Sequence, residues 1–354
     1  SGLSQKNKVK PSAESALLFK VARSSFADTY IRSLASPDIG TGSKRMKGIQ
    51  HPWRTRFKTG FIGGVHALAG YIFTTEDTLA VALYLNETGK NPDAICKDAL
   101  DSIWLRLIQV ADAEYQHIIQ AKELWLSAME IKDIQKRIQH FSEQLLETPY
   151  SLGPTGEGFK GKIDSKPIFR LDSVDCVTYM ENVLALSFAP HEDSIFSTLK
   201  QIRYLQGKPS FVNRKHYFVA DWIQKSDFAK MVISEEDTTV EKNLPKKKFF
   251  EAKGIKHQND ELLKLSYLPL NKAKEFAGKN WNEAFKIRGI GLVFAGDAVD
   301  VFHVGFLILK PGEKPLFRHA SQISGKVITQ TLESYLENSK KKIPGIVQFE
   351  FLGN

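Results

Sequence analysis

Two apolar, β-prone runs on either side of a Pro-Gly pair constrain the fold of this chain more than any other stretch. They lie between Asp297 and Ser321, and Pro311-Gly312 separates them, so the sequence predicts an antiparallel hairpin. With the turn centred on Pro311, the register pairs His303 directly with His319. Directly opposed residues have Cβ atoms about 4.5–5.5 Å apart, so one imidazole could orient the other. A slip of one residue would send one ring to the opposite face.

A second constraint is the stretch Asp172–Glu181, which places Cys176 in the first turn of a predicted helix. Ser173 can cap this helix, Asp175 favours its positive end, and an apolar face follows at helical spacing: Val177, Met180, Leu184 and Phe188. Backbone N–H groups at a helix start stabilise a thiolate and can receive an oxyanion, which suits a nucleophilic cysteine. The commoner role of a free cysteine is that of a small buried side chain.

The chain order is therefore a cysteine at a helix start, a histidine 127 residues later, and a second histidine on the next strand. Papain-like peptidases show the same order and a similar separation. The local letters differ from papain, because no Cys-Gly-Ser-Cys-Trp block is present and the third group is His319 rather than Asn. They resemble the NlpC-type cell-wall hydrolases, in which Asp-Cys opens a helix, His-Val-Gly-aromatic lies on a strand and His-Ala often follows.

Within that superfamily, residues 135–354 resemble a subgroup of N-acetylmuramoyl-L-alanine amidase-like proteins, long catalogued as a domain of unknown function. Ordinary NlpC-type enzymes have Asp-Cys-Ser-Gly, whereas Val177-Thr178 follows Cys176 here. The stretches that carry the resemblance occur in order: Thr148-Pro149-Tyr150, Gly153-Pro154, Gly156-Glu157-Gly158, Asp172–Glu181, Arg214-Lys215-His216-Tyr217-Phe218, Asp221-Trp222, Gly296-Asp297, His303-Val304-Gly305 and His319-Ala320-Ser321.

The resemblance implies a papain-like (NlpC-type) α+β domain over residues 131–354, with an antiparallel sheet packed on the nucleophile helix. It implies a cysteine hydrolase in which Cys176 attacks an amide carbonyl, His303 transfers the proton and His319 orients His303. Asp297 and Asp300 compete for the orienting role, although Asp300 has the wrong strand parity relative to His303.

The substrate that the resemblance implies is the N-acetylmuramoyl-L-alanine bond of muropeptides, including anhydromuropeptides. The expected compartment is the bacterial periplasm or cell envelope. Candidate substrate-binding residues supply hydrogen-bond donors, an acid or a flat aromatic surface. They are Tyr150, which would also assist the oxyanion, and Arg214, His216, Tyr217, Asp221 and Trp222.

Three alternatives stay open at the level of sequence. Many NlpC-type enzymes cut between D-Glu and the diamino acid of the stem peptide. A cysteine and two histidines can also form a catalytic zinc ligand set, although the helix-start position of Cys176 serves a thiolate without a metal. A wall-binding module without catalysis is the third alternative.

Composition narrows the remaining classes. The 354 residues, 42% of them hydrophobic, suffice for two modest cores, and the net charge of +9 favours anionic partners. The sequence shows no basic stripe interleaved with aromatics. It also shows no zinc-finger, helix-turn-helix or RNA-binding signature, so nothing in it favours a nucleic-acid partner. Two cysteines rule out a disulfide scaffold, and we expect both to be free thiols. No run reaches the roughly eighteen apolar residues of a membrane span, no leader is visible, and neither a cofactor nor a metal is expected.

Residues 1–130 are expected to form a mainly helical region of unknown role. Helices are predicted over 14–34, from Thr75 through Leu85, and over 93–130 as one long helix or two. The segment Phe61–Phe73 is apolar but contains three glycines and is expected to pack internally. The boundary with the catalytic domain is predicted near residue 131.

Overall fold

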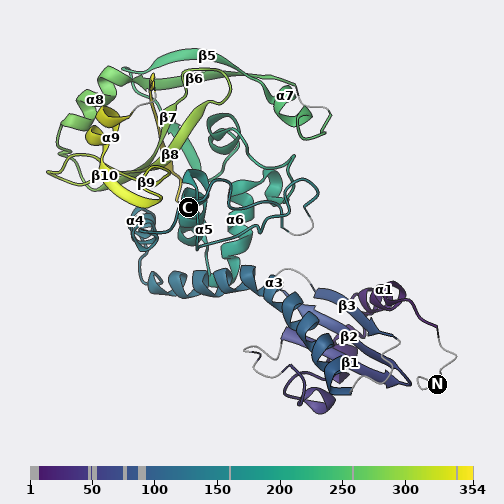
Figure 1. The fold of residues 1–354 in the computed structure, drawn as a ribbon. Helices are drawn as coiled ribbons and strands as arrows, with labels where there is room; N and C mark the ends of the chain where they lie inside the picture. The colour runs from purple at the N-terminus through teal and green to yellow at the C-terminus, as the bar shows by residue number, and fades with distance from the viewer. Residues whose placement is uncertain are drawn as a thin grey trace. The chain divides into compact units, whose positions relative to one another are not determined.

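The chain divides into two compact units, Ser1–Gln116 and His117–Asn354. The computed structural model describes residues 8–46, 49, 54–74, 78–86, 93–158, 161–256, 259–339 and 342–353, with the backbone alone over 109–116. The division falls inside one helix, α3 (Asp93–Ser127), which continues from the first unit into the second (Figure 1). The predicted boundary near residue 131 lies just beyond the end of this helix.

The N-terminal unit is built on a three-stranded antiparallel sheet with strand order β1-β2-β3. Gly63 and Gly64 join the first two strands, and their φ angles of 35° and 82° suit a tight two-residue hairpin turn. The elements of this unit, besides the start of α3, are α1 (Pro11–Val21), α2 (Ala27–Ser33), η1 (Gly40–Gly42), β1 (Thr55–Ile62), β2 (Val65–Phe73) and β3 (Thr78–Leu85).

Side chains alternate along β2, so that the two faces of this sheet pack against different helices. Leu68 and Ile72 share a core with Trp104 of α3. Ala69 and the neighbouring Tyr71 share a core with Leu18 of α1. This period of two is the pattern of a strand covered on both faces.

The predicted helix from Thr75 through Leu85 is wrong, because residues 78–85 form strand β3; its proposed start at 75–77 lies outside the described residues. Leu79, Val81 and Leu83 lie in the core with α3, while Ala80 and Ala82 contact the core with α1. An apolar run of eight residues is compatible with either structure. Pairing along its whole length with β2 decides in favour of the strand.

The C-terminal unit contains an eight-stranded antiparallel sheet with the strand path β10-β9-β8-β7-β11-β6-β5, and β4 pairs with β11 off this path. The strands are β4 (Ala229–Val232), β5 (Thr238–Leu244), β6 (Glu261–Pro269), β7 (Lys286–Val293), β8 (Val301–Leu309), β9 (Leu316–Ser321), β10 (Lys326–Thr331) and β11 (Gly345–Phe351).

Helices cover both faces of this sheet (Figure 1). On one face α4 and α5 pack against β7 and β8, and α6 packs on α5; α8 and α9 pack on the other. The result is a mixed α/β fold of antiparallel sheet and helices, which agrees with the α+β class predicted. The helices are α4 (Ile134–Gln144), α5 (Cys176–Phe188), α6 (Ile195–Arg203), α7 (Lys246–Glu251), α8 (Leu270–Gly278) and α9 (Leu332–Asn338), with the short turns η3 (Glu192–Ser194), η4 (Leu205–Gly207) and the π-helical η5 (Phe218–Ile223).

Strand β8 presents alternate residues to the two helical layers. Phe306 and Ile308 lie in the core under α5, whereas Leu307 and Leu309 lie in the core under α8 and α9. Near its start, β8 has a β-bulge: Leu292 of β7 pairs with His303, but the next residue of β7 pairs with Val301. Phe302 is therefore an extra residue in the ladder.

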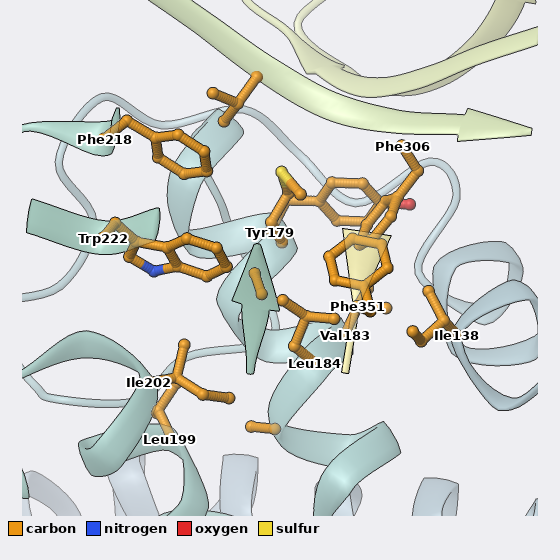
Figure 2. Packing of buried hydrophobic residues seen from close by; sticks show 14 of the residues in the cluster. Ile138, Tyr179, Val183, Leu184, Leu199, Ile202, Phe218, Trp222, Phe306 and Phe351 are labelled. Atoms are coloured by element: carbon orange, nitrogen blue, oxygen red, sulfur yellow. The ribbon is translucent and has the colours of Figure 1, made fainter. Parts of the chain in front are cut away.

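Helix α5 is enclosed by the unit, since all residues from Thr178 to Ser187 are buried. Figure 2 shows Tyr179 and Val183 of this helix close to Phe306 of β8. The single apolar face predicted from the sequence is thus too narrow, because a helix packed on all sides buries its polar residues too. Glu181, one of these polar residues, is paired with the buried Arg203 at 2.6 Å.

Candidate active site

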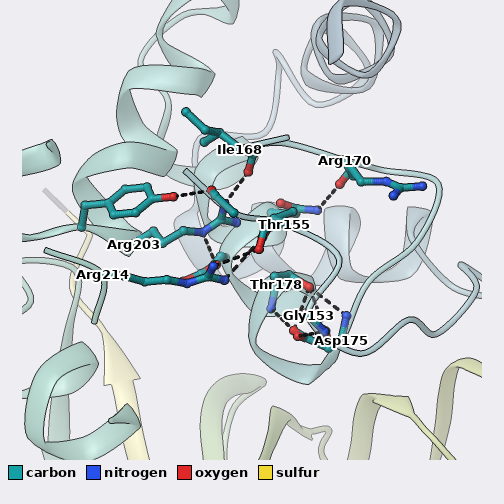
Figure 3. Close-up of polar contacts among 12 residues, drawn as sticks. Gly153, Thr155, Ile168, Arg170, Asp175, Thr178, Arg203 and Arg214 are labelled. Atoms are coloured by element: carbon teal, nitrogen blue, oxygen red, sulfur yellow. Dashed lines mark hydrogen bonds and ion pairs between the residues drawn. The ribbon is translucent and has the colours of Figure 1, made fainter. Parts of the chain in front are cut away.

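Cys176 is the first residue of α5, and the residue before it fixes the helix start. The Asp175 carboxylate accepts the backbone N–H of Thr178 at 2.8 Å, and the Thr178 hydroxyl accepts the backbone N–H of Asp175 at 2.8 Å (Figure 3). This reciprocal pair is a capping box. The cap is therefore Asp175 rather than Ser173, because Asp175 has a hydroxyl residue three positions later that returns the hydrogen bond.

The Cys176 thiol lies against the strand that carries His303. The backbone N–H of Val304, the residue after His303, lowers the pKa of the thiol, as do the backbone N–H groups of Val177 and Cys176 itself. Burial raises the pKa of the thiol to about 12, the charge of Asp175 adds to the rise, and the three N–H groups oppose it. The thiol is therefore neutral at pH 7 and needs a base in order to react as a nucleophile.

The two histidines meet, although not in the predicted register. Strand pairs such as Leu307–Phe317 centre the hairpin on Gly312 rather than on Pro311. The Glu313 N–H donates to the Lys310 carbonyl at 3.0 Å and Gly312 has φ of 80°, as in a type II turn. The partner of each residue thus shifts by two positions, which preserves the face of the sheet.

In this register His303 and His319 are diagonal neighbours, and Gly305 fills the position opposite His319. His303 Nε2 and His319 Nδ1 are 2.7 Å apart, with nearly perpendicular rings. A Cβ on Gly305 would lie 2.9 Å from the His319 Cβ and 2.6 Å from the Arg318 carbonyl oxygen. The predicted contact between the histidines is therefore present, but it depends on a glycine rather than on direct opposition.

The chain of polar groups extends to a third strand. Ile328 of β10 pairs with His319, so Gln330 is again a diagonal neighbour, and its side-chain nitrogen lies 2.9 Å from His319 Nε2. Rotation of the amide by 180° exchanges its nitrogen and oxygen, so either atom can meet the ring. His303, His319 and Gln330 form a continuous line across β8, β9 and β10.

His319 is suited to remain neutral in this line. It is 2% exposed, and burial lowers its pKa to about 4. A neutral imidazole carries one proton, and the partners of its two nitrogens decide which nitrogen holds it. Gln330 can therefore select the His319 tautomer, and His319 in turn selects that of His303.

Two tyrosines border the cysteine. Tyr335 of α9 stacks on the His303 ring with centroids 5.9 Å apart, and Tyr150 forms a backbone bridge with Val174, two residues before Cys176. Burial raises the pKa of each phenol to about 12, and the charge of Cys176 contributes to both rises. Both hydroxyl groups are thus within electrostatic reach of the thiol and stay protonated at pH 7 as hydrogen-bond donors.

Arg214 anchors the loop that leads to the helix start. Its guanidinium donates to the Thr155 carbonyl at 2.9 Å, and the same loop reaches Asp175 through the Gly153 N–H at 3.2 Å (Figure 3). The charge of Arg214 also lowers the pKa of Glu157, against a larger rise caused by burial. Arg214 is therefore connected to the Cys176 helix through one short loop.

His216 and Tyr217 are held within the unit by aromatic contacts. His216 Nε2 lies 2.7 Å from the Phe211 carbonyl oxygen, and its ring packs on Phe249 at 4.8 Å. Burial lowers the pKa of His216 to about 4. Tyr217 is 4% exposed, and the Lys246 ammonium lies 5.1 Å from its ring centroid.

Asp221 and Trp222 are also engaged internally. Asp221 is paired with Lys246 and Lys225, each at 2.6 Å. Trp222 is fully buried and stacks on Phe218 with centroids 4.8 Å apart (Figure 2). Both side chains are therefore occupied by contacts within the unit.

Asp300 serves the backbone rather than His303. Its carboxylate accepts hydrogen bonds from the backbone N–H groups of Phe218, Val219, Ala220 and Val301 at 2.7–3.2 Å. It therefore ties the start of η5 to the start of β8. Within the residues that the structure describes, no group of three His, Cys, Asp or Glu side chains is arranged to hold a metal ion, and no helix is long and apolar enough to cross a membrane.

Sequence reasoning missed Gln330, Tyr335 and the stretch Lys58-Thr59-Gly60. Gln330 points to the same face of the sheet as the two histidines, but the sequence does not show which strand lies beside it. Tyr335 lies on a short helix without a motif. Lys-Thr-Gly is a signature of penicillin-binding proteins, and here it lies on β1 with Lys58 and Gly60 exposed.

A family model for AmiA-like proteins, described as N-acetylmuramoyl-L-alanine amidase-like, matches residues 140–346. The match spans more than half of the chain and includes Cys176, His303, His319 and Gln330. The chain belongs to this family of amidase-like cell-wall hydrolases.

One solved structure, from Legionella pneumophila, agrees with the fold. A Legionella pneumophila protein of the DUF1460 family is 25% identical, with a TM-score of 0.60 over 69% of this chain and 97% of its own. An N-acetylmuramoyl-L-alanine amidase from Bacteroides uniformis is 21% identical, with a TM-score of 0.49 over 62% of this chain and 99% of its own. No curated protein matches the chain.

A second family model, for the D-Ala-D-Ala carboxypeptidase 3 (S13) family, matches residues 1–107. This match covers less than a third of the chain, and it includes the Lys58-Thr59-Gly60 stretch. The two matched regions do not overlap.

Proposed function

We propose that residues 131–354 form a papain-like (NlpC-type) cysteine amidase domain that hydrolyses the N-acetylmuramoyl-L-alanine bond of muropeptides, including anhydromuropeptides. One observation carries the proposal: Cys176 opens α5, its charge acts on Tyr335, and Tyr335 stacks on His303, which is hydrogen-bonded to His319. Membership of the amidase-like family supports the substrate class.

In the proposed first step, Cys176 Sγ forms a bond to the lactyl carbonyl carbon of muramic acid while His303 takes the thiol proton. Because His303 Nε2 is hydrogen-bonded to His319, we assign the thiol proton to Nδ1 of His303. His303 then returns the proton to the nitrogen of L-Ala as the C–N bond breaks. The products of this step are a thioester on Cys176 and a peptide with a free amino terminus.

In the second step, water attacks the thioester and His303 accepts its proton. The C–S bond breaks, the sulfur leaves as a thiolate that takes the proton from His303, and the muramic acid product loses its second proton to solvent and is released as a carboxylate. The backbone N–H of Cys176 at the helix start stabilises the oxyanion in both steps, and the Tyr150 hydroxyl is the proposed second donor.

The proposed substrate contacts follow from this direction of attack. The sugar lies on the acyl side of the scissile bond, and the peptide carboxylates lie on the other side, where Arg214 offers a cation. The proposed compartment is the bacterial periplasm or cell envelope, where muropeptides arise.

Mass spectrometry of the products from a defined disaccharide-tetrapeptide tests the proposal. We expect free peptide beginning with L-Ala and a sugar that carries no amino acid. Cys176→Ala and His303→Ala should fold and lose at least about 10³-fold in rate, because each removes a group that takes part in bond making. Cys96→Ala, which removes the buried cysteine of the other unit, is the matched control and should retain the rate.

A sugar product that retains L-Ala-D-Glu would overturn the amidase assignment in favour of the D-Glu–diamino acid endopeptidase. Unchanged hydrolysis by Cys176→Ala would end the cysteine mechanism. Loss of activity to a chelator, with recovery on zinc addition, would instead support a zinc enzyme.

We also propose that the N-terminal unit recognises the peptide end of peptidoglycan. The match of residues 1–107 to a D-Ala-D-Ala carboxypeptidase model and the exposed position of Lys58 support this role. Calorimetry with a peptide ending in D-Ala-D-Ala is the test: binding should weaken about tenfold in Lys58→Ala and stay unchanged in Lys20→Ala. Equal binding by both variants would refute it.

A further inference from the structure

A cavity of about 850 Å³ lies at the C-terminal end of α5, the end opposite to Cys176. The helix has 13 residues, so the two ends are roughly 18 Å apart at 1.5 Å per residue. The walls come from α4, α5, α6 and the segments around Lys215 and Phe228, with Leu352 and Gly353 near the chain end. The volume is typical of a small-molecule site, and none of the candidate active-site residues lines it.

The charged side chains around this cavity are mostly basic. Lys132, Arg137, Lys215 and Lys225 line it, against one carboxylate, Asp227. Lys225 is already paired with Asp221 at 2.6 Å. The other three cations give the cavity an excess of positive charge over the single carboxylate in its wall.

Lys215 is the most informative of these cations. It is 7% exposed, and its ammonium donates to the Gln201 carbonyl at 3.2 Å. Within the described residues no carboxylate lies within 4 Å of it; burial lowers its pKa, and the more distant charges of Glu181, Asp227 and Asp221 oppose this only in part. A buried cation without a close counter-ion destabilises a fold, so its presence at a cavity wall points to an anion supplied from outside.

Arg137 provides a second, independently fixed cation. Its guanidinium donates to the Leu186 carbonyl at 3.2 Å and lies over the rings of Trp125 and Phe141, at 5.3 and 5.8 Å from their centroids. Its Nε is buried and has no hydrogen-bond partner in the described part of the chain. Burial lowers the pKa of Arg137, and no described carboxylate forms an ion pair with it.

We propose that this cavity binds a small molecule carrying an oxyanion group, a carboxylate or a phosphate, with Lys215 and Arg137 meeting the anion. The remaining walls suit the body of such a molecule, since they combine aromatic and aliphatic surface with neutral polar groups. These residues are Phe188, Phe228, Leu205, Gln201, Gln206 and Thr198. The proposal is independent of the amidase mechanism, because no residue of that mechanism takes part.

Isothermal titration calorimetry with sodium phosphate and with disodium glutarate, each at constant ionic strength set with NaCl, tests the site. At least one should bind saturably and raise Tm. Lys215→Met should weaken that binding at least tenfold, yet unfold at the same or a higher temperature without ligand, because it removes a buried charge that has no close counter-ion. A lysine with a purely structural role would instead lower Tm when replaced.

Lys264→Met is the control for net charge, since Lys264 is exposed and does not line the cavity. Lys132→Met, at an exposed lining position, keeps the test valid if Lys215→Met does not fold, and should weaken binding two- to fivefold. If glutarate binds more tightly, the cavity prefers a carboxylate ligand. If phosphate binds more tightly, it prefers a phosphate ligand. Non-saturable binding of both probes, or equal affinity in the Lys132, Lys215 and Lys264 variants, would overturn the proposal.

Discussion

Two histidines of the C-terminal unit have similar electrostatics and different neighbours. Burial lowers the pKa of both His319 and His216 to about 4. His319 has side-chain partners at both nitrogens, His303 and Gln330, whereas His216 Nε2 meets the Phe211 carbonyl among phenylalanine rings. Burial and a depressed pKa are therefore the same in the histidine proposed to be catalytic and in the one packed among aromatic rings, and only the chemistry of their partners differs.

The same substitution at both positions should separate these roles most clearly. We expect His319→Ala to lower kcat about 10²-fold, because His303 loses the group that fixes its ring but keeps its ability to transfer a proton. His216→Ala should change kcat less than about threefold while lowering Tm, because it leaves a hole among aromatic rings. Steady-state kinetics and thermal unfolding measure both. Comparable kcat losses in the two variants would contradict the distinction.

A change at Gln330 sharpens the comparison by altering the far partner of His319. For His303 Nδ1 to accept a proton, His303 Nε2–H must donate to His319, and His319 Nε2–H must donate to the Gln330 oxygen. We expect Gln330→Leu, which has no acceptor, to lower kcat about tenfold with KM unchanged, and Gln330→Glu to retain most of the rate. Nitrogen NMR shifts of His319 should report the opposite tautomer in Gln330→Leu. An unchanged tautomer would remove Gln330 from the relay.

The pH dependence of stability should be the smallest effect and should treat both histidines alike. Each has a folded pKa of about 4 and an unfolded value near 6.5, so between these values the unfolded chain binds more protons. The free energy of unfolding should thus fall by about 1 kcal/mol per histidine from pH 7 to 5.5, and change little above pH 7 from this source. In His216→Phe, denaturant titrations at several pH values should show a decrease in the free energy of unfolding that is smaller by the contribution of one histidine. An unaltered slope would show that His216 is not buried in its neutral form.

The hairpin and the Cys176 helix could be predicted because their signals are local. Pro311-Gly312 and the apolar runs define two strands, and the aspartate before Cys176 marks a helix start. The register could not be fixed in the same way, since it depends on which turn residue takes the central position. The error of two positions preserved the face, so the contact of His303 with His319 survived it.

Other features could not be predicted because tertiary partners decide them. Residues 78–85 pair with β2, which no local pattern specified, and so form a strand instead of a helix. Asp221 and Trp222 combine charge with an aromatic surface. The sequence does not show that Asp221 is paired with Lys246 and that Trp222 stacks on Phe218. Gln330 reaches His319 only because β9 and β10 align, and no local signal in the sequence specifies that alignment.

Because of the bulge at Phe302, the orientation of the His303 side chain does not depend on the length of the loop before it. Beyond the bulge, the pairing of Gly291 with Val304 and of Leu292 with His303 holds the histidine in register. Before it, the Phe294 N–H meets the Asp300 carbonyl at 3.1 Å and closes a short loop. An insertion or deletion between these two residues would be absorbed ahead of the bulge. Protein engineers could therefore graft loops of different lengths beside the histidine without resetting its orientation.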